Sequence, residues 1–135
     1  MKVKIFTDGG ARGNPGPAAI GVVIKDEYDN NIIKYSKYLG DQTNNFAEYS
    51  AIISGLEKAK ELGATHAQCF LDSELVVKQL TGKWKIKEPT LQKLFVLAYN
   101  AAAEIEKVSY SHIYREKNKE ADALVNKELD KKTSE

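Results

Sequence analysis

The chain has 135 residues, of which 42% are hydrophobic and 29% charged, and its formal net charge is +1. This length predicts a single domain with its own core over residues 1–131, followed by a frayed tail at 132–135. No apolar run approaches the roughly 18 residues of a membrane span, the first residues lack the apolar stretch of a secretion signal, and the single Cys69 cannot form an internal disulfide, so we expect a cytoplasmic protein with no membrane partner.

Three strands in quick succession open the chain and predict an antiparallel meander. They cover residues 3–7, 20–26 and 32–39, and the glycines and prolines between the first two predict a turn. A helix follows over 44–62, where apolar residues recur at three- and four-residue steps and Gly63 supplies the stop.

The second half of the chain alternates strands and helices. The predicted elements are a strand at 66–72, a helix at 73–80, an extended stretch at 83–87, a helix at 89–106, a strand at 108–114 and a helix at 118–130. Strands that alternate with helices after a meander imply an α/β fold, with a mixed sheet and helices on both of its faces.

Glu48 is an acid on the apolar face of the helix predicted over 44–62. By helical spacing Ile52 and Ala59 lie within roughly 40° of it, whereas the later charges of the helix lie roughly 120° or more away. A carboxylate in that position loses hydration unless something pairs with it. The alternative is a first-turn acid that the helix dipole favours.

Three other acids lie at the ends of predicted elements. Asp8 ends the first strand and Asp72 ends the fourth, so both would emerge at one edge of the sheet if these strands are parallel neighbours, and such edges bind ligands in open α/β sheets. Asp122 falls in the first turn of the last helix. The alternatives are a turn-forming Asp8, a helix-capping Asp72 and an Asp122 that complements the helix dipole.

Four carboxylates that converge without histidines or thiolates have a specific chemical use. They present hard oxygen ligands, which suit Mg²⁺ or Mn²⁺ better than zinc. Two such ions, roughly 3.5–4 Å apart, can activate a water and stabilise the leaving oxygen in phosphodiester cleavage. The ions would also relieve the mutual repulsion of the bare carboxylates.

The segments that contain these acids resemble the four motifs of type 1 ribonuclease H (ribonuclease HI). They are TDGGARGNPGPAAIG with Asp8, TNNFAEYSAI with Glu48, LDSELVVKQL with Asp72 and REKNKEADALVNKEL with Asp122. The order and approximate spacing are those of the family, and the match covers nearly the whole chain. The resemblance implies a ribonuclease H-like fold whose five-stranded mixed sheet has strands one to three antiparallel and strands four and five parallel to the first.

The resemblance also implies an activity. Members of the family are nucleases that cut the RNA strand of an RNA–DNA hybrid with two metal ions, Mg²⁺ or Mn²⁺, and leave a 5′-phosphate and a 3′-hydroxyl. In the family the first and last acids hold the metal beside the attacking water, and the first three hold the other. This assigns Asp8 as the bridging ligand between the two ions.

Substrate-binding positions follow from the same motifs. The family lets backbone at the glycine-rich turn approach the RNA strand and read its 2′-hydroxyls. The matching positions are Gly9, Gly10, Ala11 and Asn14 in this turn, Asn44 and Asn45 at the start of the helix that bears Glu48, and Ser73 beside Asp72. Helix capping is the alternative for the two adjacent asparagines, and both roles are open for Asn44.

The chain departs from many family members after the helix that follows Asp72. Some members carry a basic protrusion there, whereas here Leu80 leads directly to Pro89, which indicates a compact form. A lysine-rich strip remains in this segment and suits a DNA backbone and sugar. The strip consists of Lys83, Trp84, Lys85 and Lys87. The alternative is a solvated edge with Trp84 packed in the core.

The second departure is the loop before the last helix, YREKNKEAD, where many members place a histidine and this chain has none. We expect Arg115 to bind a phosphate there, because its planar guanidinium suits that contact. The alternative is a surface ion pair between Arg115 and Glu116 or Glu120.

Two other functions compete with a monomeric hybrid-specific nuclease. One is a nucleic-acid-binding module of the same fold with little turnover, supported by the missing histidine and protrusion. The other is a broader nuclease that also cuts double-stranded RNA, since a short strip could discriminate less well on the second strand.

Overall fold

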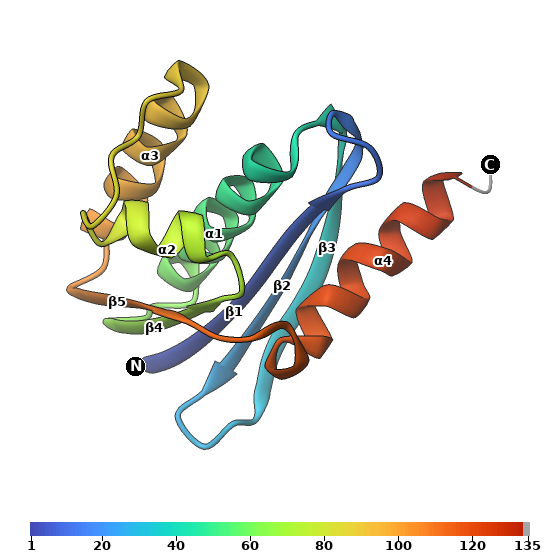
Figure 1. Cartoon of the computed structure of the whole chain (residues 1–135). Coiled ribbons are helices and arrows are strands. Elements are labelled where there is room, and N and C mark those ends of the chain that lie inside the picture. The colour runs from blue at the N-terminus through green and yellow to red at the C-terminus, as the bar shows by residue number, and fades with distance from the viewer. Residues whose placement is uncertain (134–135) are drawn as a thin grey trace.

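The structure, a computed structural model, describes residues 1–133. Its elements in chain order are β1 (Lys2–Ala11), β2 (Gly16–Asp26), β3 (Asn31–Gln42), α1 (Asn44–Glu61), β4 (His66–Leu71), α2 (Glu74–Leu80), α3 (Pro89–Ala103), β5 (Lys107–His112), the 3₁₀ helix η1 (Arg115–Lys117) and α4 (Lys119–Thr133). The five strands form one sheet in the order β3-β2-β1-β4-β5 (Figure 1). β1, β2 and β3 pair antiparallel, and β4 and β5 run parallel to β1, so the predicted fold class is confirmed.

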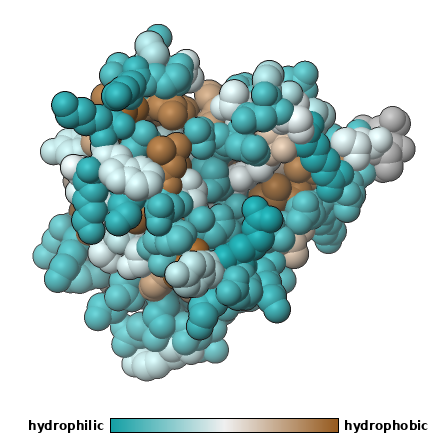
Figure 2. All heavy atoms as spheres, viewed as in Figure 1, coloured by the Kyte–Doolittle hydropathy of each residue, from teal (hydrophilic) through white to brown (hydrophobic). Residues whose placement is uncertain are grey.

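The helices cover both faces of the sheet, as predicted. α1 packs on β1 and β2, α3 packs against α1, and α4 packs on the opposite face against β1, β2 and β3. Figure 1 shows β1 running between α1 and α4, so the strand that carries Asp8 is flanked by the helices that carry Glu48 and Asp122. The molecular surface in this view is mostly hydrophilic, and hydrophobic residues are visible only in patches (Figure 2).

The first two strands are longer than predicted. Gly9 and Gly10 belong to the β1–β2 ladder, opposite Ile20 and Ala19, so the turn itself is confined to residues 12–15. The reason for a glycine at position 9 is the close approach of α1, because a Cβ there would lie 2.2 Å from the carbonyl carbon of Ala47. The prediction that Asp8 ends its strand was therefore wrong, since Asp8 lies inside the ladder opposite Gly21.

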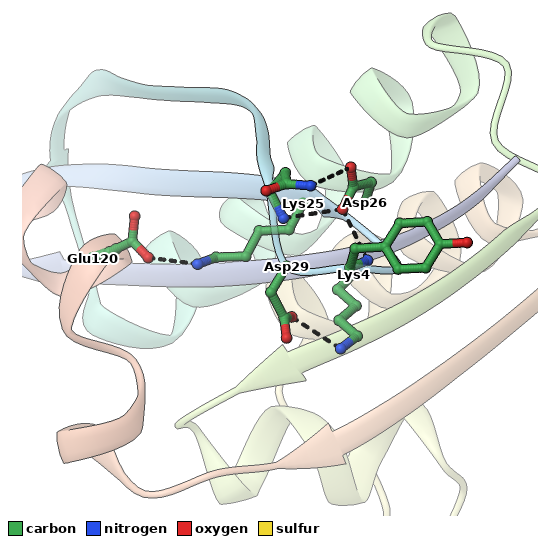
Figure 3. A network of polar contacts seen from close by, with 7 residues as sticks. Lys4, Lys25, Asp26, Asp29 and Glu120 are labelled. Atoms are coloured by element: carbon green, nitrogen blue, oxygen red, sulfur yellow. Dashed lines mark hydrogen bonds and ion pairs between the residues drawn. The ribbon is translucent and has the colours of Figure 1, made fainter.

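A network of ion pairs and hydrogen bonds joins the start of α4 to the sheet (Figure 3). Lys25 of β2 pairs with Glu120 at 2.8 Å, and Lys4 of β1 pairs with Asp29 of the β2–β3 turn at 2.9 Å. Asp26 accepts hydrogen bonds from backbone amides within the same turn. Within this network the Lys25–Glu120 pair links β2 to the first turn of α4, which also carries Asp122.

Other predictions differ from the structure as well: β3 is longer than 32–39, and α3 and β5 end before residues 106 and 114. Residues 83–87 form an irregular loop and not an extended strand. The predicted frayed tail at 132–135 was wrong for its first two residues, because α4 continues to Thr133, whose hydroxyl donates to the carbonyl of Leu129 at 2.9 Å. Residues 134–135 lie outside the described part of the chain. Among residues 1–133, no helix combines the length and apolar character that a membrane-spanning segment requires.

Candidate active site

Three of the four predicted acids meet at one point. Asp8, Glu48 and Asp72 each offer a carboxylate oxygen, and these oxygens all lie within 4.8 Å of one another. They line a cavity of about 550 Å³ at the point where β1, α1 and the end of β4 come together. Asp122 lines the same cavity from α4, outside the group of three.

Asp8 is buried, with 8% of its surface exposed, because it projects from the middle of a paired strand. This position excludes the turn-forming alternative. Glu48 lies beyond the first turn of α1, which contains no acid, so the simple dipole alternative also fails. The backbone N–H of Gly9 donates to Oε1 of Glu48 and brings that carboxylate against the strand that carries Asp8.

Asp72 follows the last residue of β4 and is not a helix cap. Ser73 is the N-cap of α2, and its hydroxyl oxygen accepts from the N–H of Val76 at 3.2 Å. The carboxylate of Asp72 is left to face the cavity, where its Oδ2 accepts a hydrogen bond from Nδ2 of Asn118 at 3.1 Å.

Asp122 lies in the first turn of α4, as the helix-dipole alternative requires. It also lines the cavity, so the two interpretations are compatible for this residue. Its Oδ2 accepts from Nδ2 of Asn126 at 3.3 Å.

The cluster is electrostatically costly without a cation. Burial raises the pKa of Asp8 to about 7, the charge of Asp72 adds to this rise, and that of Asp122 contributes less. Burial, followed by the charge of Asp8, also raises the pKa of Glu48 well above its ordinary value. The three carboxylates repel one another when all are ionised, and a cation between them would relieve this repulsion. Because the ligands are carboxylate oxygens, the site fits a hard divalent cation such as Mg²⁺ or Mn²⁺. Asp8, Glu48 and Asp72 are the residues that could hold one.

Several known proteins are similar to this chain in sequence or in structure. The family described as reverse transcriptase-like matches residues 6–128. Among curated proteins, the bifunctional protein Rv2228c of Mycobacterium tuberculosis is 45% identical over 96% of this chain and 36% of its own length. Ribonuclease HI of Halobacterium salinarum is 40% identical over 96% of this chain and 65% of its own length. A solved structure, LC11-RNase H1 in complex with RNA/DNA hybrid, is 46% identical with a TM-score of 0.93, and the match covers 98% of this chain and 99% of that one.

The chain belongs to the type 1 ribonuclease H family. It spans just over a third of Rv2228c and just under two thirds of the Halobacterium enzyme. Its fold has the compact form of this family, as predicted, because α2 leads to α3 through residues 81–88 with no further helix between them.

Most predicted substrate positions of this ribonuclease H surround the acids. The residues that line the cavity with them include Gly9, Gly10, Ala11, Asn44, Asn45, Ser73 and Arg115. Asn14 lies outside this lining, and its Oδ1 accepts from the N–H of Asn44 at 3.0 Å. Asn44 in turn accepts from the N–H of Ala11 at 2.8 Å, so these side chains tie the turn to the start of α1. Neither asparagine of the adjacent pair caps the helix, because the N-cap is Thr43.

The lysine-rich strip of this ribonuclease H is not part of the cavity. Its four residues lie on the exposed loop between α2 and α3. Trp84 is 44% exposed, which excludes the alternative of a tryptophan packed in the core. Arg115 forms no ion pair within residues 1–133, and Glu120 is paired with Lys25 instead, so the surface-pair alternative for Arg115 fails.

Sequence reasoning missed Asn118. This residue is 2% exposed and contacts Asp72, yet it lies in a charged loop where an asparagine looks like an ordinary helix start. Its position four residues before Asp122, one helical turn away, was the available signal. Arg12 was also missed; it lines the cavity and pairs with Asp130 of α4 at 2.6 Å.

Proposed function

We propose that this ribonuclease H hydrolyses the RNA strand of RNA–DNA hybrids as an endonuclease that depends on divalent metal, leaving 5′-phosphate and 3′-hydroxyl ends. The observation that carries the proposal is the convergence of Asp8, Glu48 and Asp72 within 4.8 Å on a ribonuclease H fold. A relative at 46% identity that was solved with an RNA/DNA hybrid supports the substrate class.

Two ions, Mg²⁺ or Mn²⁺, are the cofactors of this proposal. Asp8, Glu48 and Asp72 would hold one, and Asp8 and Asp122 the other, with Asp8 shared between them. When bound, the ions supply an activated water and stabilise the leaving oxygen of the phosphodiester. The Gly9 N–H donates to Oε1 of Glu48 and would help to keep this carboxylate beside Asp8 in such an arrangement.

The remaining residues bind and orient the substrate. Asn44 uses Oδ1 for the Ala11 N–H, and within residues 1–133 its Nδ2 donates to nothing, so this group is free to contact a 2′-hydroxyl. Arg115, at the rim of the cavity, presents an unpaired guanidinium to a phosphate. The exposed strip around Trp84 would contact the backbone and sugars of the DNA strand.

The test is cleavage of an end-labelled RNA–DNA hybrid with Mg²⁺ or Mn²⁺. Asp8→Asn and Asp72→Asn should each abolish the products, whereas Asp41→Asn, at an exposed acid of β3 outside the cavity, should not. An intact hybrid in the presence of either metal would overturn the proposal. Hybrid binding that persists in EDTA without cleavage would identify a binding module instead.

Double-stranded RNA in a parallel reaction tests the broader nuclease. The exposed strip is short and lacks the family's basic protrusion, which is the feature that favours this alternative. Equal rates on the two substrates would establish it. A monomeric state and a cytoplasmic location stay predictions from the sequence, and gel filtration would measure the first.

A further inference from the structure

The side chain of Asn118 lies at the junction of three segments that carry the acids. Its Nδ2 donates to the backbone carbonyl of Thr7 at 2.9 Å, next to Asp8 in β1. The same nitrogen donates to Oδ2 of Asp72 at 3.1 Å. Its backbone carbonyl accepts from the N–H of Asp122 at 3.1 Å. Asn118 is thus hydrogen-bonded to Asp72, to Asp122 and to Thr7, the neighbour of Asp8.

The orientation of this amide is determined by its neighbours. The carbonyl of Thr7 can only accept a hydrogen bond, and an ionised Asp72 can only accept one, so the NH₂ group and not the oxygen must face them. Both hydrogens are then used. The amide oxygen Oδ1 is left buried and has no partner among residues 1–133.

That unpaired oxygen indicates what the side chain contributes. A buried acceptor without a donor destabilises the folded protein, and a small apolar residue at position 118 would avoid this loss. Asn118 is 2% exposed, so solvent at the surface does not satisfy the oxygen directly. The two hydrogen bonds that the amide donates therefore explain why an asparagine occupies position 118.

We propose that Asn118 is a positioning residue that fixes the carboxylate of Asp72 for metal binding. Asp72 follows the end of β4, and the hydrogen bond from Asn118 reaches its side chain from a distant segment. The Asn118 amide holds Oδ2 and leaves Oδ1 free for a cation, and its second bond ties this arrangement to β1. Groups that orient a metal ligand in this way typically change metal affinity 10–100-fold when they are removed. The inference rests on the proposed function only in assuming that the cluster binds a divalent cation.

The experiment measures Mn²⁺ binding by titration calorimetry, without nucleic acid. Asn118→Ala should weaken binding about 10-fold in the wild-type background. In an Asp72→Asn background the same substitution should change the affinity less than about twofold, because the ligand that Asn118 orients is already altered. A matched control is Gln79→Ala, which removes another buried amide, one bonded to the Tyr49 hydroxyl at 2.6 Å and outside the cavity. This variant should lose stability and keep its Mn²⁺ affinity.

Two results would overturn the role of Asn118. One is wild-type affinity for Mn²⁺ in Asn118→Ala, and the other is an equal loss of affinity in both backgrounds, which indicates a general structural effect. If Asn118→Ala does not fold, the role is tested in proteins that keep Asn118, by following the nuclear magnetic resonance signals of its side-chain amide. They should shift when Mg²⁺ is added to the wild type and stay unchanged in Asp72→Asn. A wild-type protein that binds no Mn²⁺ would instead overturn the proposed function together with this role.

Discussion

Asp8→Asn should make the metal-free protein more stable at alkaline pH. Burial and the charge of Asp72 raise the pKa of Asp8 from 3.8 to about 7 in the folded protein. The folded carboxyl therefore keeps its proton at pH values where the unfolded one has lost it. The free energy of unfolding should fall as the pH rises from about 4 to about 7, and the penalty should be complete above that range.

The size of the effect follows from this shift. Each unit of pKa corresponds to about 1.4 kcal/mol, so a rise from 3.8 to about 7 sets an upper value of about 4 kcal/mol. The measured difference in stability between Asp8→Asn and the wild type should be smaller, because Asp8 and Glu48 repel each other. A proton bound to either carboxyl relieves this repulsion for both. We expect Asp8→Asn to be about 2–4 kcal/mol more stable than the wild type at pH 8.5, and nearly equal to it at pH 4.

Urea unfolding followed by far-ultraviolet circular dichroism, in EDTA at both pH values, measures the difference. Asp41→Asn is the control, because it removes an exposed acid of β3 and should give the same stability as the wild type at each pH. Added Mg²⁺ should then stabilise the wild type more than Asp8→Asn. An Asp8→Asn protein that is less stable than the wild type at pH 8.5, or equally stabilised at both pH values, would refute the electrostatic account of the cluster.

Three further substitutions test the surroundings of the acids. Gly9→Ala would place a Cβ 2.2 Å from the backbone of Ala47, so it should destabilise the protein by about 3 kcal/mol and displace Glu48, lowering both the melting temperature and the Mn²⁺ affinity. Arg115→Ala should raise the KM for a hybrid and leave the melting temperature unchanged, since this exposed side chain forms no ion pair within residues 1–133. Trp84→Ala should change stability by less than about 0.5 kcal/mol and weaken hybrid binding in fluorescence anisotropy, whereas unchanged binding would remove the strip from the interface.

Local patterns were enough to predict most elements and the inward-facing acid on α1. Helical spacing placed Glu48 on the inner face of its helix because that spacing is a property of the backbone alone. The common edge of Asp8 and Asp72 was predicted on the condition that their strands are parallel neighbours, and the parallel register between β1 and β4 meets that condition.

Contacts between distant segments were not predictable in this way. The sequence around Gly9 indicates a turn, and only the approach of Ala47, far away in the chain, explains why the strand continues through a glycine. The contacts of Asn118 were missed for the same reason, because its partners, Thr7 of β1 and Asp72 just after β4, are distant from it in the sequence. The strip around Trp84 could be placed on a loop, but its distance from the cavity depends on packing.

The acids of the cavity are oriented by neutral donors and not by cations. Within residues 1–133 the lysines and arginines form ion pairs with surface acids, namely Asp29, Glu61, Glu120 and Asp130. The cluster is held instead by the N–H of Gly9 and the amide of Asn118. A neutral donor fixes where a carboxylate oxygen lies and leaves its charge intact, whereas a paired lysine would cancel that charge and compete with a metal ion for the same oxygen. Burial, followed by the unneutralised charge of Asp72, raises the pKa of Asp8, and that negative charge is also what would draw a divalent cation into the cavity.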